Sequence, residues 1–303
     1  MNYRYIEKIN KNNIEINPYP HLIIDDFLDS HYLTMIKEFW PNNNLHNDLR
    51  GSNCFYFSSE LKNENTQIQN FWKDFLNNHI YEIGNLLFNK FYKYLEYKNV
   101  SEKIEWGTGY SQENNDKIKP LDFSPHTHFD HDPLWVLTFL LYINDENNNS
   151  PGTSLYSIGN SKNERIENFK KWNEIWHSEE GSKDDYKNKI LKINELKLEN
   201  TKTVDFIENR LFCFFDSPFS FHSVNYLKTD ELVNRKSLRF ALGFERNKLQ
   251  DLYNIQPEKW VNVFSENNTE IIDKILQIEH DNFFNEKIDK PKKNYFIDNF
   301  PFF

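Results

Sequence analysis

The chain of 303 residues is short of cysteine and glycine, and it lacks a long apolar segment. Its two cysteines, Cys54 and Cys213, are too few for a disulfide framework, so we predict two reduced thiols in a cytosolic protein. The apolar run Leu134 to Ile143 is far too short to cross a bilayer. The first eight residues also lack the apolar core of a secretory signal peptide. We therefore expect a cytoplasmic protein with no membrane partner.

A surplus of basic charge is missing as well. The chain has 36 Lys and Arg against 46 Asp and Glu, which gives a formal net charge of −10. The basic residues are scattered, so there is no basic field for a phosphate backbone, and we predict no nucleic-acid partner. Aromatic residues make up 17% of the chain, with 27 Phe, which favours a well-packed globular core over a disordered chain.

The first hundred residues predict one short strand followed by helices. His21 to Asp25 has the composition of a short strand, and Asp29 or Ser30 can cap a helix from about His31 to Trp40. Between about Gln67 and Lys98, apolar residues recur at helical spacing over one long helix or two in sequence. We expect these helices to back a sheet.

From Ile104 onward the apolar pattern changes to that of strands. In the run Leu134 to Ile143, the odd-numbered positions from 137 to 141 should face one way and the even-numbered positions from 138 to 142 the other. Further strands are predicted at residues 104–107, 153–158, 211–215, 220–226 and 237–244, with a C-terminal helix near residues 270–280.

The segment Asn160 to Thr203 interrupts the strands. It is strongly charged and helix-prone, with Trp172, Ile175 and Trp176 as its main apolar anchors. Two interpretations stay open: a mobile flap or lid over the β core, and a solvated surface excursion.

The order of the elements predicts an α+β fold with a mainly β core. Helices come first, then many short strands with a helical insertion, then a helix, which is typical of an antiparallel sandwich or barrel flanked by helices. The chain has no internal repeat and no break in composition, so we predict a single domain over residues 1–303. Its parts would be the supporting elements 1–103, the β core 104–250 with the insertion 160–203, and the helical tail 251–303.

The segment Ser124 to Pro133 contains three histidines and two aspartates in ten residues. Within it, His128 and Asp130 are two positions apart, so on a strand both side chains point to the same face. His222 lies beside another apolar strand far downstream and could complete the set. Two imidazoles and one carboxylate leave about three positions of an octahedral iron open, as in non-haem iron(II) oxygenases.

The register of this cluster has an alternative. His126 and His128 form a His-x-His pair of the kind found in cupin-like metal proteins, and His131 with Asp132 could compete for the same metal. We favour His128 with Asp130 because these two keep the His-x-Asp spacing. His126, His131 and Asp132 would then shape the surroundings of the metal.

Several sequence pieces follow the His-x-Asp pair in a fixed order. In that order they resemble the iron(II)- and 2-oxoglutarate-dependent dioxygenases of the prolyl-hydroxylase-like branch, over about residues 18 to 245. The order of the pieces is more specific than any one piece. The resemblance implies a double-stranded β-helix, which is a cupin-like jelly roll, flanked by N-terminal and C-terminal helices. The pieces are Leu137 to Asn144, Gly152 to Tyr156, Asn209 to Phe214, Ser220 to Val224 and Arg235 to Leu238, preceded by the opening unit Pro18 to Leu28.

The resemblance also implies a metal and a cosubstrate. His128, Asp130 and His222 would bind Fe(II) and carry the catalysis, with 2-oxoglutarate and O2 taking the open positions. The prolyl-hydroxylase-like pattern assigns no further metal ligand to this chain.

For the cosubstrate, the resemblance implies that Arg235 pairs with the distal carboxylate of 2-oxoglutarate, a role suited to the two parallel donors of a guanidinium group. Tyr142 would donate a hydrogen bond to the same carboxylate, and Thr138 lies on the same strand face to support it. The spacing from His222 to Arg235 is longer than in many relatives, so Arg239, with the same strand parity, is the alternative.

The implied reaction is hydroxylation of a polar small molecule, such as an amino acid, a sugar or a secondary metabolite, with release of succinate and CO2. Asp130 stands where related halogenases have Gly or Ala, which makes hydroxylation the default, while desaturation and ring formation stay open. The alternatives are a hydroxylase of a protein side chain, a cupin-type metal protein that does not use 2-oxoglutarate, and a non-catalytic binding module. The sequence decides neither the substrate nor the oligomeric state.

Overall fold

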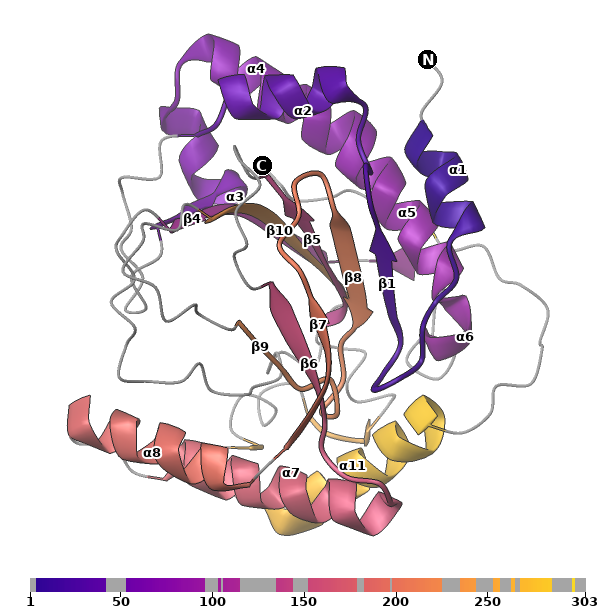
Figure 1. Cartoon of the computed structure of the whole chain (residues 1–303), viewed down its shortest axis with the longest axis vertical. Helices are drawn as coiled ribbons and strands as arrows, with labels where there is room; N and C mark the ends of the chain where they lie inside the picture. The colour runs from indigo at the N-terminus through magenta and orange to yellow at the C-terminus, as the bar shows by residue number, and fades with distance from the viewer. Residues whose placement is uncertain are drawn as a thin grey trace.

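The computed structural model describes residues 4–41, 53–95, 103–104, 106–114, 135–143, 152–178, 183–196, 198–224, 235–243, 253–256, 263–264, 268–284 and 296–297. Two antiparallel sheets form the centre of the molecule, and helices cover them (Figure 1). In the described helices, no segment has the length and apolar character needed to span a bilayer.

The larger sheet contains six described strands. Their order is β1 (His21–Ile24), β8 (Leu211–Phe215), β5 (Trp135–Tyr142), β10 (Arg235–Gly243), β4 (Trp106–Asn114) and β2 (Asn53–Tyr56). The smaller sheet has the order β7 (Glu199–Val204), β6 (Thr153–Ser157) and β9 (His222–Val224). A short parallel pair joins β11 (Phe296–Ile297) to β3 (Lys103–Ile104).

The helices surround these sheets. They are α1 (Arg4–Lys11), α2 (Ser30–Glu38), α3 (Phe57–Glu60), the 3-10 turn η1 (Leu61–Asn63), α4 (Thr66–Phe75), the π-helical turn η2 (Leu76–Ile80), α5 (Tyr81–Lys90), α6 (Tyr92–Leu95), α7 (Lys162–His177), α8 (Lys183–Glu195) and α11 (Thr269–Phe284). Most elements predicted from apolar spacing are present within a few residues of their expected bounds. Helix α1 and strand β2 were not predicted.

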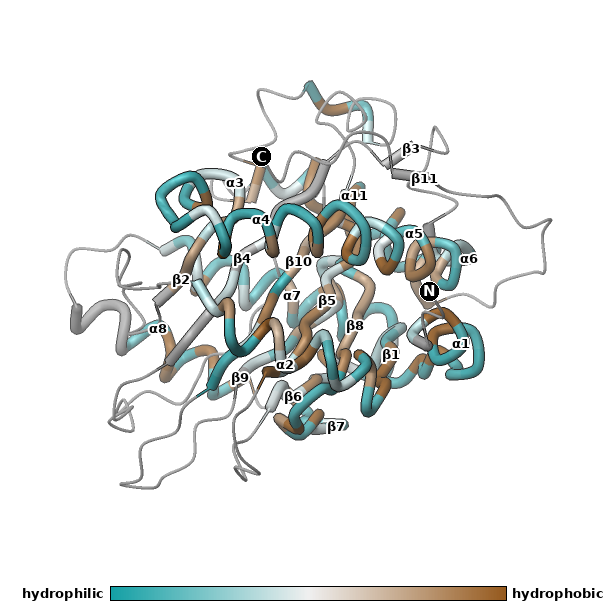
Figure 2. Tube along the Cα trace, turned by 90° about the horizontal axis from the view of Figure 1, so that it is seen from above, coloured by the Kyte–Doolittle hydropathy of each residue, from teal (hydrophilic) through white to brown (hydrophobic). Residues whose placement is uncertain are grey.

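The predicted alternation along β5 is confirmed by the way the larger sheet packs. The ring centroids of Phe139 and Phe240 on neighbouring strands are 5.1 Å apart, and Phe57 of α3 stacks on Phe240. Phe57 in turn contacts Trp72 of α4, which is fully buried. The odd-numbered side of β5 therefore packs under the N-terminal helices, as expected for helices that back a sheet. Figure 2 places these apolar stretches in the interior, with hydrophilic helix surfaces outside.

One of the two interpretations of the insertion, the solvated surface excursion, is wrong for helix α7. Helix α7 begins with a capping box in which Ser161 and Glu164 satisfy each other's backbone N–H groups. Its Phe169 and Trp172 are fully buried and belong to the main core cluster. This part is therefore core and not a solvated excursion, because burying two large aromatic rings fixes the helix against the sheets.

The end of the same segment corrects the prediction a second time. Residues Glu199 to Val204 form strand β7, which pairs with β6 in the smaller sheet, where we predicted helical insertion as far as residue 203. The strand is mostly exposed and polar, so it has no apolar alternation to reveal it. The division of the chain into 1–103, 104–250 and 251–303 stays a prediction, although one core cluster runs from Tyr5 to Phe283.

Candidate active site

The predicted site residues fall into two groups. His222, Arg235, Tyr142 and Thr138 belong to the described part of the chain. His128 and Asp130 lie outside the described residues, and the same holds for the competing positions 126, 131 and 132. Arg235, Tyr142 and Thr138 occupy the face of the larger sheet opposite the N-terminal helices, which we call the inner face, and His222 lies in the smaller sheet.

Strand register places the predicted side chains on this inner face. Tyr142 of β5 is opposite Ser237 of β10, and Thr138 is opposite Ala241. Since side chains alternate along a strand, Arg235 shares a face with Ser237 and therefore with Tyr142. Tyr142 and Thr138 are four residues apart, which is about 13 Å along an extended strand.

Arg235 lies in a compact group that we call the arginine cluster, made of Arg235, Phe206, Tyr142 and Thr153. The guanidinium carbon of Arg235 is 4.5 Å from the ring centroid of Phe206. Phe206 stacks on Tyr142 with centroids 4.2 Å apart, and the Tyr142 hydroxyl is 2.9 Å from the Thr153 hydroxyl. Stacking on an aromatic face fixes the plane of a guanidinium group.

The electrostatics of the arginine cluster keep its tyrosine neutral. Burial raises the pKa of Tyr142, and the Thr153 hydrogen bond and the charge of Arg235 lower it by less. The hydroxyl therefore remains a hydrogen-bond donor beside a permanent positive charge. A cation with neighbouring hydroxyl groups suits a carboxylate, which can accept two hydrogen bonds from one guanidinium group.

The sequence did not identify two members of the arginine cluster. Phe206 follows strand β7, and Thr153 begins strand β6, so both reach the inner face through the smaller sheet. Thr153 lies within the piece Gly152 to Tyr156, which belongs to the family resemblance and could have indicated Thr153 as a site residue. Phe206 has no sequence signal that we recognise.

His222 begins strand β9 in the smaller sheet and is 6% exposed. Its Nδ1 is 2.9 Å from the carbonyl oxygen of Ser220. A carbonyl only accepts, so Nδ1 carries the proton and Nε2 of the neutral ring carries the lone pair. This arrangement is the usual one for a histidine that binds a metal through Nε2. The ring also lies 4.9 Å from that of Phe214, whose strand partner is Thr138.

Thr138 has a partner that the sequence did not predict. Its hydroxyl donates to Oδ2 of Asp216 at 2.5 Å, and both side chains are almost completely buried. Asp216 comes directly after the fully buried strand β8 and begins a polar turn. The polarity of that turn gives no sign that Asp216 is buried. The assignment of Thr138 to the cosubstrate stays a prediction.

Two further arginines lie near the predicted site residues. Nε of Arg210 donates to Oδ1 of Asp25 at 2.5 Å. Arg239, the alternative to Arg235, is half-buried on the inner face opposite Leu140. Asn209, beside Arg210, exchanges two hydrogen bonds of 2.8 Å with the backbone of Leu28, which ties the opening unit to the core.

A metal site cannot be assembled from the described residues alone. Among them, no three His, Cys, Asp or Glu side chains gather in a way that could hold a metal ion. His222 supplies a fitting nitrogen donor, and the other two predicted ligands belong to the part of the chain that is not described. The donor chemistry of the full predicted set, two imidazoles and one carboxylate, fits iron(II).

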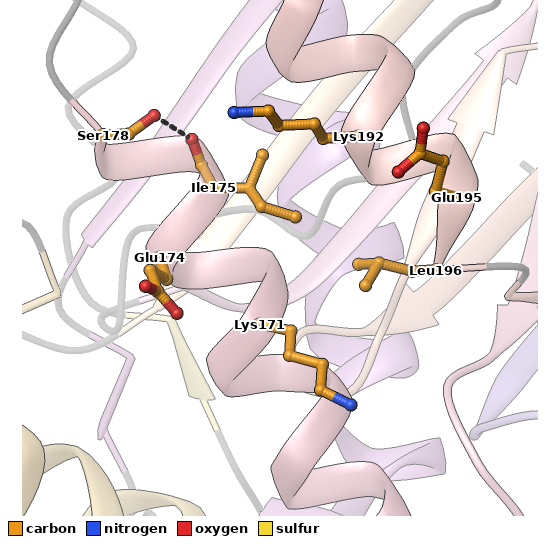
Figure 3. A pocket seen from close by; sticks show the side chains of 7 residues that line it. All are labelled: Lys171, Glu174, Ile175, Ser178, Lys192, Glu195 and Leu196. Carbon is orange, nitrogen blue, oxygen red and sulfur yellow. Dashed lines mark hydrogen bonds between the residues drawn. The ribbon is translucent and has the colours of Figure 1, made fainter.

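A separate cavity of about 580 Å³ opens between helices α7 and α8 (Figure 3). None of the predicted site residues contributes to it, and its two lysines and two glutamates favour no ligand of one charge sign. It is therefore distinct from the inner face. Its lining residues are Lys171, Glu174, Ile175, Ser178, Lys192, Glu195 and Leu196.

Comparison with known proteins gives similarity only at the level of solved structures. No family model matches the chain, and no curated protein matches it. A prolyl hydroxylase from Trichoplax adhaerens, in complex with a peptide of the hypoxia-inducible factor, is 15% identical, with a TM-score of 0.47 over 82% of this chain and 92% of that one. A prolyl 4-hydroxylase from Phytophthora capsici is 13% identical, with a TM-score of 0.43 over 91% and 84%.

HygX from Streptomyces hygroscopicus, with nickel, 2-oxoglutarate and hygromycin B bound, is 9% identical, with a TM-score of 0.43 over 76% of this chain and 84% of that one. These proteins are of the kind that the sequence pieces resemble. With TM-scores below 0.5 and identities of at most 15%, the likenesses do not carry an assignment of function. That assignment depends on the side chains of the inner face.

Proposed function

We propose that the chain is an iron(II)- and 2-oxoglutarate-dependent dioxygenase that hydroxylates a polar small molecule and releases succinate and CO2. The observation that carries the proposal is the arginine cluster on the inner face, together with His222 on the smaller sheet. A half-buried cation with hydroxyl donors and a histidine held in the metal-binding tautomer are the two ends that a bound keto acid requires.

The order of strands supports a jelly roll as the scaffold. Along the chain, β5 belongs to the larger sheet, β6 and β7 to the smaller, β8 to the larger, β9 to the smaller and β10 to the larger. Such alternation between two antiparallel sheets is the winding of a jelly roll, with the inner faces enclosing a ligand site.

In this proposal the arginine cluster binds 2-oxoglutarate. Arg235 pairs with the distal carboxylate, and the neutral hydroxyl of Tyr142 donates to the same group. Phe206 contributes no charge, but its ring holds the guanidinium plane and excludes water from one side, which strengthens the charge-assisted hydrogen bonds.

The metal end would use His222 with His128 and Asp130. Bound iron(II) supplies the chemistry of O2 activation, with 2-oxoglutarate as the source of two electrons. His222 contributes its Nε2 lone pair. The Ser220 carbonyl accepts a hydrogen bond from the Nδ1–H group, which keeps the proton on Nδ1 and the lone pair on Nε2. A carboxylate at position 130 completes the set and leaves no space for a halide, so the proposed outcome is hydroxylation.

The substrate class is inferred from composition and charge. An acidic chain with many aromatic residues suits a polar small molecule, such as an amino acid, a sugar or a secondary metabolite. A protein side chain is the alternative, and it would be recognised in the same experiment by including peptides in the substrate panel.

The test is anaerobic reconstitution with iron(II), followed by O2, 2-oxoglutarate and a metabolite panel, with succinate as the measured product. We expect succinate release that one class of compound stimulates. An iron-bound protein that neither binds nor turns over 2-oxoglutarate would overturn the proposal and favour the cupin-type alternative. The register is tested in parallel, because Asp130→Ala should weaken iron binding far more than His126→Ala.

A further inference from the structure

The turn between β8 and β9 consists of residues 216–221 and delivers the chain directly to His222. We call it the histidine turn. Its own hydrogen bonds define its shape: Ser220 N donates to the Ser217 carbonyl at 3.0 Å, and Phe219 N donates to the Ser217 hydroxyl at 3.0 Å. The Ser220 hydroxyl donates back to the Phe215 carbonyl at 2.5 Å. The turn is therefore a small closed unit and not an open loop.

The first residue of the histidine turn is attached to the larger sheet. Asp216 N donates to the Val136 carbonyl at 3.1 Å, which continues the pairing with β5 for one residue past β8. The Asp216 carboxylate accepts a hydrogen bond from the Thr138 hydroxyl, with 2.5 Å between Oγ1 and Oδ2. Asp216 is 2% exposed and Thr138 is fully buried. A carboxylate that leaves water needs strong hydrogen bonds, so this contact constrains the turn more than a solvent-exposed one would.

The far end of the histidine turn holds the imidazole ring. The Ser220 carbonyl accepts the Nδ1 proton of His222, and the next carbonyl, that of Phe221, accepts from Tyr19 Oη at 3.1 Å and Tyr156 N at 3.0 Å. Behind the turn, the Phe221 ring meets Trp172 of α7 edge to face, with centroids 5.4 Å apart. The backbone of the two residues before His222 is thus fixed.

We propose that the buried pair Thr138–Asp216 positions His222 for the metal, by anchoring the histidine turn whose Ser220 carbonyl sets the orientation and tautomer of the ring. The inference rests on the proposed function, because it takes His222 as an iron ligand. It gives Thr138 a role at the metal end through Asp216, where the family resemblance placed it with the cosubstrate. Neither Thr138 nor Asp216 needs to contact the metal.

The two roles of Thr138 lead to opposite results. Residues that orient a metal ligand change metal affinity by about 10–100-fold when they are substituted. A residue that contacts the cosubstrate changes the KM for 2-oxoglutarate and leaves the metal affinity almost unchanged.

The experiment uses the full chain and measures Fe(II) affinity by anaerobic titration, with Tm and the KM for 2-oxoglutarate recorded for each variant. Thr138→Val keeps the shape and removes the hydroxyl, Asp216→Leu keeps a similar shape and removes both acceptor oxygens, and Thr138→Ser keeps the hydroxyl. We expect the first two to bind Fe(II) about 10–100-fold more weakly and the serine variant to stay within about threefold of the unchanged protein. The double variant Thr138→Val/Asp216→Leu should be no weaker than the weaker single variant, since both substitutions remove the same contact.

A matched control separates positioning from simple loss of stability. Tyr253→Phe removes another buried hydroxyl-to-carboxylate contact, the one between Tyr253 and Glu279 of α11. It should lower Tm as Thr138→Val does and leave Fe(II) affinity unchanged. Equal losses of Fe(II) affinity in Tyr253→Phe and Thr138→Val would overturn the inference.

His222→Ala distinguishes the failure of this inference from the failure of the proposed function. If His222→Ala abolishes Fe(II) binding while Thr138→Val and Asp216→Leu bind normally, the positioning role is wrong and the proposed function stands. If His222→Ala binds Fe(II) as the unchanged protein does, both are wrong. A raised KM for 2-oxoglutarate with normal Fe(II) affinity in Thr138→Val would assign Thr138 to the cosubstrate instead.

Discussion

The arginine cluster and the histidine turn are built by different means. In the arginine cluster, side chains from four separate segments hold one another by stacking and by the hydroxyl contact between Tyr142 and Thr153. In the histidine turn, backbone carbonyls hold the His222 ring, and the turn is supported from behind. Cosubstrate binding should therefore depend on the identity of side chains, and metal binding on the geometry of a turn.

The largest expected effect comes from removing the support behind the histidine turn. Trp172→Ala leaves a cavity beside Phe221, and we expect the free energy of unfolding to fall by about 3–5 kcal/mol, as for other buried tryptophans. Urea denaturation measures this loss. If the variant remains folded, its Fe(II) affinity should fall while its KM for 2-oxoglutarate stays unchanged.

The neighbouring Trp176 provides the control for this substitution. It stacks on Trp172 with centroids 5.6 Å apart but is only partly buried. Trp176→Ala should therefore cost much less stability and leave Fe(II) affinity unchanged. Equal effects of the two substitutions would show that α7 acts only through overall stability, and that Trp172 has no specific role in supporting the histidine turn.

The next effect concerns the charge in the arginine cluster. Arg235→Gln removes the cation that pairs with the distal carboxylate, and we expect the KM for 2-oxoglutarate to rise about 100-fold, since a charge-assisted contact contributes about 1.5–3 kcal/mol. Fe(II) affinity in the absence of 2-oxoglutarate should not change. Arg239→Gln is the matched control on the same strand face, and a large rise in KM there with a small one at Arg235 would reverse the assignment.

A smaller effect is expected from the hydroxyl group beside that charge. Tyr142→Phe keeps the ring that stacks on Phe206 and removes only the donor, so the fold should be retained. We expect the KM for 2-oxoglutarate to rise about tenfold, which corresponds to about 1.4 kcal/mol for one hydrogen bond to a charged group. Steady-state succinate release measures it. A KM within twofold of the unchanged protein would place the carboxylate elsewhere.

The two regions also differ in how far the sequence predicts them. The face of Tyr142 and Thr138 follows from the two-residue period of β5, which is a local property of the chain. Phe206 and Thr153 meet Tyr142 only after β6 and β7 pair in the smaller sheet, so no local pattern indicates them. Asp216 was missed for a related reason, because its burial depends on Thr138, 78 positions earlier in the chain.

The insertion illustrates the same limit at the level of an element. Its helix could be predicted from charge and composition, and Trp172 was identified as an apolar anchor. Whether that anchor reaches the core depends on Phe221 and Phe264, which are distant in sequence and pack with α7 only in the fold. Strand β7 was missed because its polar, exposed residues lack the apolar alternation by which strands are recognised.

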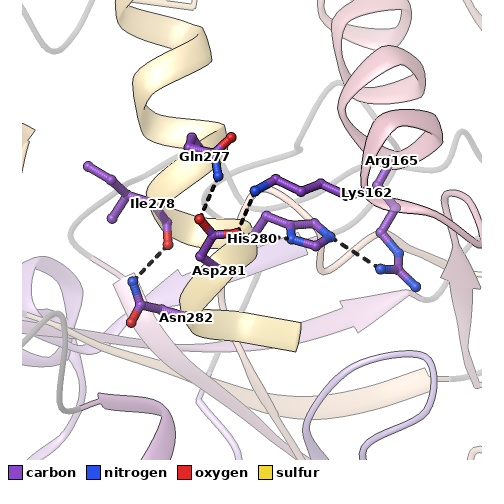
Figure 4. A network of polar contacts seen from close by, with 7 residues as sticks. All are labelled: Lys162, Arg165, Gln277, Ile278, His280, Asp281 and Asn282. Carbon is purple, nitrogen blue, oxygen red and sulfur yellow. Dashed lines mark hydrogen bonds and ion pairs between the residues drawn. The ribbon is translucent and has the colours of Figure 1, made fainter. Parts of the chain in front are cut away.

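The smallest expected effect is a pH dependence of stability at the contact between α7 and α11, behind the histidine turn. Arg165 Nη1 donates to Nε2 of His280 at 3.2 Å, so this nitrogen must accept and the ring is neutral (Figure 4). Burial lowers the pKa of His280, and the charges of Arg165 and Lys162 lower it further, although Asp281 opposes them. Between this lowered pKa and the unfolded value of about 6.5, the unfolded chain binds more protons, so stability falls as the pH drops below about 6.5.

The variant His280→Gln tests this dependence. A glutamine can accept the same hydrogen bond from Arg165 and does not titrate, so the free energy of unfolding should decline less steeply below pH 6.5 than in the unchanged protein. At pH 8 the two proteins should have nearly the same stability, because His280 is neutral in both the folded and the unfolded chain. Parallel declines of the two proteins below pH 6.5 would assign the acid sensitivity to the other buried histidines, His21, His79 and His177, whose pKa values burial also lowers. The contact between α7 and α11 would then support the histidine turn independently of pH.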